Sequence, residues 1–452
     1  MEKDLGKKVV LAVAGSDSIG GAGLQADIKA LASLGVHCAS VITAITSQNT
    51  QSVRRIFPIP KEEIIYQIDA IMEDTKVAAA KTGMLYSAEI AAAVASRMKN
   101  CDFPIIVDPV LVAGVGDPLS TEDLIQALIE EMIPLASLVT PNIPEAETIT
   151  GIRISTSEDR IKVCERFVEI GAKSVLLKGG HTASEYGEQI VDTFYADGEI
   201  IEYRHPRSEH RGHGGGCILS SFIAGYLAMG MSLTESVSKA SRRIEDSILM
   251  SYAVGKGSKI VNAMATAEKE MEKYSVEKAL RIAIKQLESI LPVSWIPEVG
   301  INFAYALPFA KEPEEVCALE GRIVAVDGKP LHVGCVDFGA SRHVAQVVLS
   351  AMRFDPSKRS AINIRFSEET LRRFQERGLS ISEFERRKEP NGRKTMEWGT
   401  EEAIRKAGFV PDVIYDRGGH GKEPMIRIIG TDPFDVIEKI SMTLRSEATV
   451  VS

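Results

Sequence analysis

The sequence predicts an α/β protein of two domains: a mainly parallel sheet with helices on both faces, followed by a second, smaller α/β domain. Three observations lead to this prediction. In the first part of the chain, short apolar runs alternate with stretches of helical pattern, as in successive βα units. From residue 262 to 290 the sequence turns strongly helical and contains neither glycine nor proline. A length of 452 residues accommodates about two to four domains.

The elements of the first domain follow from this alternation. Val9–Val13 is a short buried-strand run, and a glycine-rich turn separates it from a helix expected over residues 22–34. Further strands are predicted over 39–44, 104–108, 136–140 and 174–178, and further helices over 89–98 and 159–171. Ligands of such sheets bind beyond the C-terminal ends of the strands. The residues that follow each strand are therefore the first candidates for a functional site.

We place the domains at residues 1–265 and 275–452, with 266–274 as a linker and a helix over 275–290 in the second domain. Strands are expected there over 321–326, 331–336 and 361–366, and helices over 342–352, 368–377, 399–407 and 435–444. The basic run Arg386-Arg387-Lys388 is most simply a solvated loop, with a phosphate-contacting loop as the alternative.

Composition excludes several classes of protein. Hydrophobic residues make up 44% and charged residues 25%, as in ordinary globular proteins. A net charge of −9 argues against a nucleic-acid partner. Every apolar run falls short of the roughly 18 residues that cross a bilayer, and the N-terminus lacks a secretory pattern. Six cysteines without a CxxC pair predict reduced thiols. We expect a cytoplasmic homo-oligomer acting on small molecules, with no membrane partner.

The strongest local signal is Gly214-Gly215-Gly216-Cys217, which precedes a small-residue helix expected over 218–229. Successive glycine N–H groups at a helix N-terminus form an anion hole. The helix dipole predicts a lowered pKa for Cys217, which would let it take a proton from a substrate hydroxyl. The alternative is a flexible loop before a buried cysteine. The turn at residues 15–23 is also glycine-rich, but it is not a P-loop and suits a purely structural role equally well.

Polar side chains at other strand ends match a phosphoryl-transfer site. Asp108, Asn142 and Glu145 are candidates to hold Mg²⁺ through water molecules, and Lys178 is a candidate ligand of ATP phosphates. Each cluster alone suits a salt-bridged turn equally well. Together with the anion hole, they predict a kinase without a P-loop that uses ATP and Mg²⁺.

These motifs carry a resemblance over roughly residues 8–260. The order AGSDSIGGAGLQADIKA, SVITAITSQNT, KTGML, VDPVLVAGVGDPL, TPNIPEAE, LLKGGH and HGGGC resembles the hydroxymethylpyrimidine (phosphate) kinases of thiamin biosynthesis, in the ribokinase superfamily. The resemblance implies a ribokinase-like fold and phosphorylation of both the pyrimidine and its monophosphate. It implies a pyrimidine pocket bordered by Gly15, Asp27, Gln48, Met84 and Val110, and an ATP site served by Asn142, Glu145 and Lys178. Cys217 stands where other ribokinase relatives use a catalytic Asp.

Two departures from the family pattern matter. The family usually reads Gly-Thr-Gly-Cys where this chain has a triglycine, which loses a hydroxyl but keeps the backbone donors. It usually reads Ala-Lys-Ser-Gly where this chain has Ala113-Gly114-Val115-Gly116, which removes two side chains suited to a phosphorylated substrate. The second departure bears on phosphorylation of the monophosphate more than on the first phosphorylation.

Two glycine-containing turns of the second domain carry cations. One holds Arg342 and His343, and the other holds Arg417, His420 and Lys422. Together with Arg353 and Arg365, they are expected to cradle a diphosphate, with Asp416 or Glu423 orienting them or holding Mg²⁺. The alternative is a pair of ordinary polar turns with surface ion pairs.

The second domain also carries a resemblance, over roughly residues 275–447. The stretches PEVGINFAYALPFA, VDFGASRHVA and YDRGGHGKEP resemble the thiamine-phosphate synthase domain fused behind this kinase in archaea and some bacteria. The resemblance implies coupling of hydroxymethylpyrimidine diphosphate to thiazole phosphate with release of pyrophosphate. Two alternatives stay open: a non-catalytic thiamine-phosphate sensor in this position, and a kinase for another aromatic alcohol such as pyridoxine.

Overall fold

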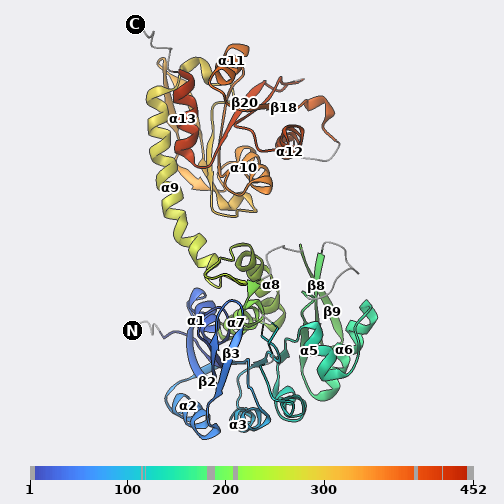
Figure 1. Ribbon diagram of the computed structural model, residues 1–452. Helices are drawn as coiled ribbons and strands as arrows, with labels where there is room; N and C mark the ends of the chain where they lie inside the picture. Colours follow the sequence, from blue (N-terminus) through green and yellow to red (C-terminus); the bar gives the residue numbers. More distant parts are fainter. Residues whose placement is uncertain are drawn as a thin grey trace. The chain divides into compact units, whose positions relative to one another are not determined.

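The computed structural model describes residues 6–113, 116–117, 119–180, 189–206, 212–390, 395–419 and 421–444 (Figure 1). The chain forms two compact units that divide between Ala267 and Glu268. Helix α9 (Ala265–Ile290) runs across this division, so the stretch 266–274, expected as a linker, is helical. Within the described residues, no helix is both long and apolar enough to cross a membrane.

The first unit is built on a nine-stranded sheet in the order β3-β2-β1-β4-β5-β6-β7-β8-β9. Strands β2, β1, β4, β5, β6 and β7 pair in parallel, and antiparallel partners extend both edges. The mainly parallel sheet is therefore confirmed. Its strands are β1 (Val9–Asp17), β2 (His37–Gln48), β3 (Val53–Pro58), β4 (Val77–Thr82), β5 (Ile105–Val107), β6 (Leu138–Val139), β7 (Ser174–Leu177), β8 (Gln189–Ala196) and β9 (Glu199–Pro206).

Helices cover both faces of this sheet, because alternate residues of the central strands are apolar on each side. Val10 packs with α1 (Gly23–Ser33), α7 (Gly215–Ala228) and α8 (Leu233–Leu249). Leu11 and Val13 pack on the other side with α2 (Lys61–Asp74), α3 (Ala88–Met98), α5 (Ile143–Thr150) and α6 (Ser157–Ile170). The sheet is consequently buried on both faces, and its open edge for ligands is the C-terminal end of the parallel strands.

The second unit contains a seven-stranded sheet in the order β16-β13-β12-β17-β20-β19-β18, antiparallel except for the pair β18–β19. Its strands are β12 (Phe303–Ala306), β13 (Val316–Leu319), β16 (Val336–Phe338), β17 (Ser360–Arg365), β18 (Ile381–Glu383), β19 (Val413–Asp416) and β20 (Met425–Gly430). A separate hairpin joins β14 (Arg322–Val326) and β15 (Lys329–Val333). The single strand expected over 331–336 is interrupted at Gly334, whose φ of +90° favours glycine.

The two faces of the second sheet have separate cores. Helices α10 (Arg342–Phe354) and α12 (Thr395–Ala407) pack on one face. Helices α9, α11 (Glu368–Glu376) and α13 (Pro433–Leu444) pack on the other. The unit is thus a three-layer α/β domain, as expected in class, although its sheet is mainly antiparallel.

Candidate active site

The triglycine forms the start of α7, three residues earlier than the helix predicted at 218. Gly214 is the N-cap residue with a φ of +96°, and it gives the helix no side-chain hydrogen bond. Glycine has no Cβ, and one added at Gly214 would lie 1.8 Å from the carbonyl oxygen of Gly21. The backbone of this turn is therefore in close contact with the backbone of the loop after β1, and only glycine fits at this position. The N–H groups of the first turn, including those of Gly215 and Gly216, are left available for an anion.

A lysine–aspartate pair lies directly beside this helix start. The Nζ atom of Lys178, which follows β7, is 2.8 Å from Oδ1 of Asp108, which follows β5. A Cβ at Gly216 would lie 3.0 Å from Lys178 Nζ and 3.8 Å from Asp108 Oδ2. Thr140 Oγ1 also donates to Asp108 Oδ1 over 3.0 Å. The structure thus brings three predicted site residues together at the C-terminal edge of the sheet.

Asn142 and Glu145 begin helix α5 with a capping box. The Asn142 Oδ1 atom accepts from the Glu145 N–H over 2.9 Å, and a Glu145 carboxylate oxygen accepts from the Asn142 N–H over 2.8 Å. Burial raises the pKa of Glu145 to about 7, with Lys178 opposing and Asp108 adding to this shift. The charge of Asp108 disfavours ionisation of Glu145, and a divalent cation between them would offset this effect, so the oxygen atoms of Asp108, Asn142 and Glu145 fit Mg²⁺. No cluster of three or more His, Cys, Asp or Glu side chains suited to a metal occurs among the described residues.

The expected lowered pKa of Cys217 is wrong in this structure. Cys217 lies in the first turn of α7 and is partly exposed, yet desolvation raises the pKa of its thiol to about 11. Lys81 opposes that rise, whereas the carboxylates of Asp27 and Asp108 add to it. Burial and two nearby negative charges therefore outweigh the helix dipole, which alone contributes only about 0.3–1 kcal/mol at exposed sites.

Most residues expected at the pyrimidine pocket gather near the first glycine loop. A Cβ at Gly15 would lie 2.8 Å from the sulfur of Met84, and Val110 packs against the apolar cluster that includes Met84. Gln48, at the end of β2, approaches His213 with 2.9 Å between Nε2 atoms. His213, which had no predicted role, is also 3.0 Å from Asp17 Oδ2.

Asp27 differs from the expectation of a pocket-lining side chain. Its carboxylate is fully buried and lies 2.9 and 3.0 Å from Nζ of Lys81, which is also fully buried. Ser221 Oγ donates to the same carboxylate over 2.7 Å. The sequence did not predict a role for Lys81, because its partner Asp27 is 54 positions away. The position of Lys81 in the motif Lys81-Thr82-Gly83-Met84 could have indicated that it lies near the site.

Several residues of the predicted motifs lie outside the described residues. These are Gly114, Val115 and Pro118 in the motif VDPVLVAGVGDPL, together with His181, Arg211 and the predicted catalytic His420.

In the second unit, strand register fixes where the loop carrying Arg342 and His343 lies. The Gly339 N–H after β16 donates to the Val316 carbonyl over 3.0 Å, and Val316 pairs with Ala306. The Ala306 N–H in turn donates to the Arg359 carbonyl over 2.8 Å, immediately before β17. This loop therefore lies at the end of the sheet where β17 begins.

The loop after β19 lies at the other end. Asp416 pairs with Met425, and Met425 pairs with Arg365 at the last position of β17. The expectation that both loops cradle one diphosphate is therefore contradicted, because the strand register separates them along the sheet. The sequence does not encode this separation locally, since it follows from the direction of each strand.

The cations near the β19 loop are held by carboxylates. Asp416 is buried and pairs with Arg386 (2.5 Å) and Arg427 (2.9 Å), which lowers its pKa against the effect of burial. Arg386 is therefore an ion-pair partner and not simply a solvated loop residue. The other cations also have partners: Arg417 pairs with Glu368, Lys422 with Glu389, Arg365 with Glu423, and Arg353 with Glu397 and Glu401.

Arg342 and His343 have a different environment. They are the first two residues of α10, and both side chains are exposed. The N-cap residue Ser341 makes no side-chain hydrogen bond to the helix. Within the part of the chain that the structure describes, neither Arg342 nor His343 has an ion pair or side-chain hydrogen bond. Cations at a helix N-terminus oppose the dipole, whereas a bound anion would be favoured by both the dipole and the cations.

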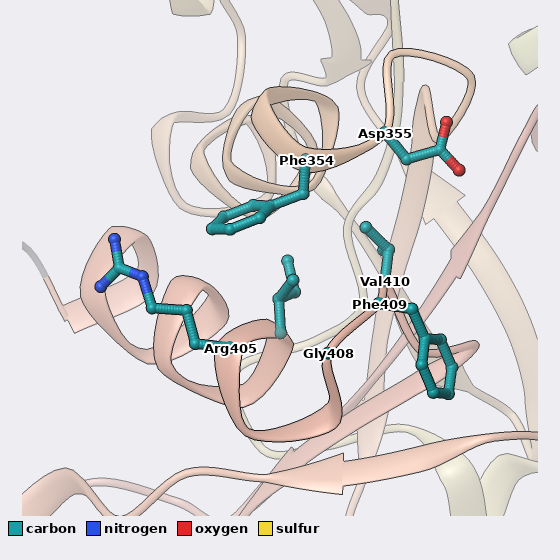
Figure 2. A pocket seen from close by; sticks show the side chains of 7 residues that line it. Phe354, Asp355, Arg405, Gly408, Phe409 and Val410 are labelled. Atoms are coloured by element: carbon teal, nitrogen blue, oxygen red, sulfur yellow. The ribbon is translucent and has the colours of Figure 1, made fainter.

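A cavity of about 380 Å³ lies elsewhere on the second unit, at the C-terminal ends of α10 and α12 (Figure 2). It is lined by Phe354, Asp355, Ile404, Arg405, Gly408, Phe409 and Val410. It contains none of the predicted site residues.

Comparison with known proteins agrees with this division of the chain. Residues 17–262 match the family phosphomethylpyrimidine kinase, and residues 279–442 match thiamine-phosphate synthase ThiN. The chain is 35% identical over 436 residues to the bifunctional thiamine biosynthesis protein ThiDN of Methanocaldococcus jannaschii, covering 96% of this chain and 98% of that protein. It is 38% identical over 250 residues to a hydroxymethylpyrimidine/phosphomethylpyrimidine kinase of Bacillus subtilis, covering 55% of this chain and 91% of that protein.

Among solved structures, an ADP complex of Bacillus subtilis pyridoxal kinase superposes with a TM-score of 0.54 at 28% identity, over 58% of this chain and all of that chain.

Proposed function

The chain belongs to the phosphomethylpyrimidine kinase family and carries a thiamine-phosphate synthase ThiN domain behind the kinase, and on this premise we propose that it catalyses consecutive steps of thiamine biosynthesis. The first unit phosphorylates hydroxymethylpyrimidine and its monophosphate with ATP. The second unit couples the resulting diphosphate to thiazole phosphate and releases pyrophosphate. The observation that carries the kinase assignment is the Lys178–Asp108 pair beside the N-terminus of α7.

In the kinase reaction the protein mainly positions groups and stabilises charge. The N–H groups of Gly215 and Gly216 receive the charge that develops on the transferred phosphoryl group, and Lys178 contacts the nucleotide phosphates. Asp108, Asn142 and Glu145 would hold Mg²⁺ through water, and Mg²⁺ neutralises phosphate charge when bound. The substrate hydroxyl passes its proton to the sulfur of Cys217 as its oxygen attacks the γ-phosphorus and ADP leaves. Cys217 must therefore be ionised before it acts.

Gln48 is suited to read the pyrimidine edge, because an amide offers both a donor and an acceptor to an aminopyrimidine. Replacing it with Leu leaves polar groups of the ligand unpaired, at about 1–3 kcal/mol. Calorimetric titration of the Gln48→Leu variant with hydroxymethylpyrimidine measures this cost. Unchanged affinity would place the pocket elsewhere.

The deciding experiment supplies the purified chain with Mg-ATP and either hydroxymethylpyrimidine or pyridoxal. Production of the pyrimidine mono- and diphosphate, with a higher kcat/KM than for pyridoxal, supports the assignment. A preference for pyridoxal would instead make the chain a pyridoxal kinase, the activity named for the similar B. subtilis structure.

For the synthase reaction we place the pyrophosphate at the N-terminus of α10. The bond between the pyrimidine methylene and the diphosphate oxygen breaks, the aminopyrimidine delocalises the positive charge, and the thiazole nitrogen then forms the new carbon–nitrogen bond. The protein must stabilise the departing pyrophosphate, and Arg342, His343 and the uncapped helix N–H groups are suited to this. At the other end of the sheet, Asp416 serves mainly to hold the structure through its pairs with Arg386 and Arg427.

Two matched variants test this placement in the full chain. Arg342→Ala should lower the rate of thiamine phosphate formation about 10²–10³-fold, as loss of a donor to a developing charge does. Arg417→Ala should change it little, because Arg417 is committed to Glu368. If Arg417→Ala lowers the rate more than Arg342→Ala does, the pyrophosphate binds at the loop after β19 instead. A parent chain that binds the diphosphate and thiazole phosphate yet makes no product would be a sensor.

A further inference from the structure

A buried pair of opposite charges lies behind the anion hole. Lys81, in β4, and Asp27, in α1, are both 0% exposed and are joined by contacts of 2.9 and 3.0 Å. A Cβ at Gly83 would lie 3.0 Å from Lys81 Nζ, so the backbone after β4 closes over the ammonium. Replacing a buried ion pair by apolar groups is often neutral or stabilising, so stability alone gives weak reason for this pair.

Helix α7 connects the pair to Cys217. Ser221 donates to Asp27 over 2.7 Å, and Cys217 lies four residues earlier, on the same face one turn closer to the helix N-terminus. The charged groups that act on the Cys217 thiol come from four elements: Asp27 in α1, Lys81 in β4, Asp108 after β5 and Lys178 after β7. Asp108 and Lys178 already pair with each other beside Gly216.

We propose that Lys81, held by Asp27, which in turn accepts a hydrogen bond from Ser221 of α7, is the positioning residue that controls the protonation state of Cys217. This inference deepens the proposed kinase function and rests on it. Lys81 stays protonated throughout, while the thiol proton of the resting enzyme leaves to solvent. The thiolate then accepts the hydroxyl proton of the substrate, so the S–H bond forms as the O–H bond breaks.

The electrostatic directions agree with this role. Burial works to lower the pKa of Lys81, but Asp27, Cys217 and Asp108 raise it above its usual value, so Lys81 carries its charge at neutral pH. Of the neighbouring charges that act on the pKa of the Cys217 thiol, Lys81 has the largest effect and lowers it, and Asp27 follows with the opposite sign.

The experiment measures the initial rate of Cys217 alkylation by iodoacetamide at about pH 8–9 in the full chain, without ATP, substrate or metal, with each cysteine quantified by mass spectrometry. At this pH the rate is proportional to the small thiolate fraction. Lys81→Met keeps the volume and removes the positive charge, so the rate at Cys217 should fall about tenfold, the change in ionisation equilibrium that corresponds to one pKa unit. Asp27→Asn removes the opposing charge and should raise this rate. Cys101, which is partly exposed in the same unit, should not change in either variant.

The two variants break the same ion pair, so rate changes in the same direction, or no change, would overturn the proposal. If Lys81→Met fails to fold by thermal melting, the double variant Lys81→Met/Asp27→Asn takes its place, and its alkylation rate at Cys217 should be lower than that of Asp27→Asn alone. Alkylation needs no substrate, so its result is independent of the proposed function. A parent that does not phosphorylate hydroxymethylpyrimidine would refute that function and leave this measurement interpretable.

Discussion

Replacing Asp416 with Asn should destabilise the second unit strongly, because one carboxylate there holds two guanidinium groups. Its oxygens lie 2.5 and 3.1 Å from nitrogen atoms of Arg386 and 2.9 Å from Arg427, and Arg427 is only 4% exposed. Breaking a buried pair by removing one partner costs about 3–5 kcal/mol, since the remaining charge is left uncompensated. At about 2–4 °C per kcal/mol for a domain of this size, the melting temperature should fall by roughly 6–20 °C.

The assay is calorimetry of the full chain combined with hydrogen exchange of peptides from β19 and β20. The matched control is Glu368→Gln, which breaks the exposed pair with Arg417 and should leave melting unchanged. Folding lowers the pKa of Asp416 below its value in the unfolded chain, which is near 3.8. The ionised carboxylate therefore stabilises the folded state above about pH 3.8, and this stabilisation is lost as the pH falls through the pKa of Asp416 in the folded state. The difference between Asp416→Asn and parent should therefore shrink below about pH 4. A melting temperature within 2 °C of the parent at pH 7 would refute a structural role for this loop.

Three further predictions concern the kinase unit. Cys217→Ala should lower kcat for the pyrimidine about 10²–10⁴-fold, the usual range for loss of a general base, and an unchanged kcat in a steady-state assay would remove Cys217 from the mechanism. Because burial raises the pKa of Glu145 to about 7, the parent loses stability as pH rises from about 4.5 to about 7. The melting temperature of Glu145→Gln should therefore exceed that of the parent at pH 8 and equal it at pH 4. A difference in melting temperature that does not depend on pH would contradict this prediction. Gly214→Ala should abolish the native anion hole and with it ATP binding, because the new Cβ would lie 1.8 Å from the Gly21 carbonyl oxygen. Gly215→Ala is the control: the nearest atom to its Cβ would be 3.8 Å away, so this variant should still bind ATP. Calorimetric titration with ATP measures both affinities.

Local patterns sufficed to predict much of the fold. The apolar run at Val9–Val13 and the alternation that follows it predicted the parallel sheet, and the triglycine indicated a helix N-terminus, although α7 begins three residues before the predicted start at 218. Strand β4 was not predicted, because its small residues Ala78, Ala79 and Ala80 lack the branched side chains typical of strands. Its burial between two neighbouring strands, β1 and β5, overrides that propensity.

The parts of the site that depend on long-range geometry were less accessible. The effect of the helix dipole on Cys217 was estimated without the carboxylates of Asp27 and Asp108, which reach it only through the fold. Arg342 and Arg417 occupy similar glycine-containing turns, yet strand direction sends them to opposite ends of the sheet. Residue type and spacing identified the cations of the second unit but not their partners.

The backbone contact between Gly21 and Gly214 also constrains the order in which the kinase unit assembles. The bond between Asp17 and His213 that secures it joins residues 196 positions apart. At about 5–20 residues per second, a ribosome needs roughly 10–40 seconds to synthesise that interval. The early strands can pair during this time, since β1, β2 and β4 are close in sequence, but the nascent chain has no α7 to complete the site. At the proposed anion hole, nucleotide binding would therefore begin only after nearly the whole first unit has been synthesised, and a chain that stalls before Gly214 has most of the sheet but lacks the start of α7.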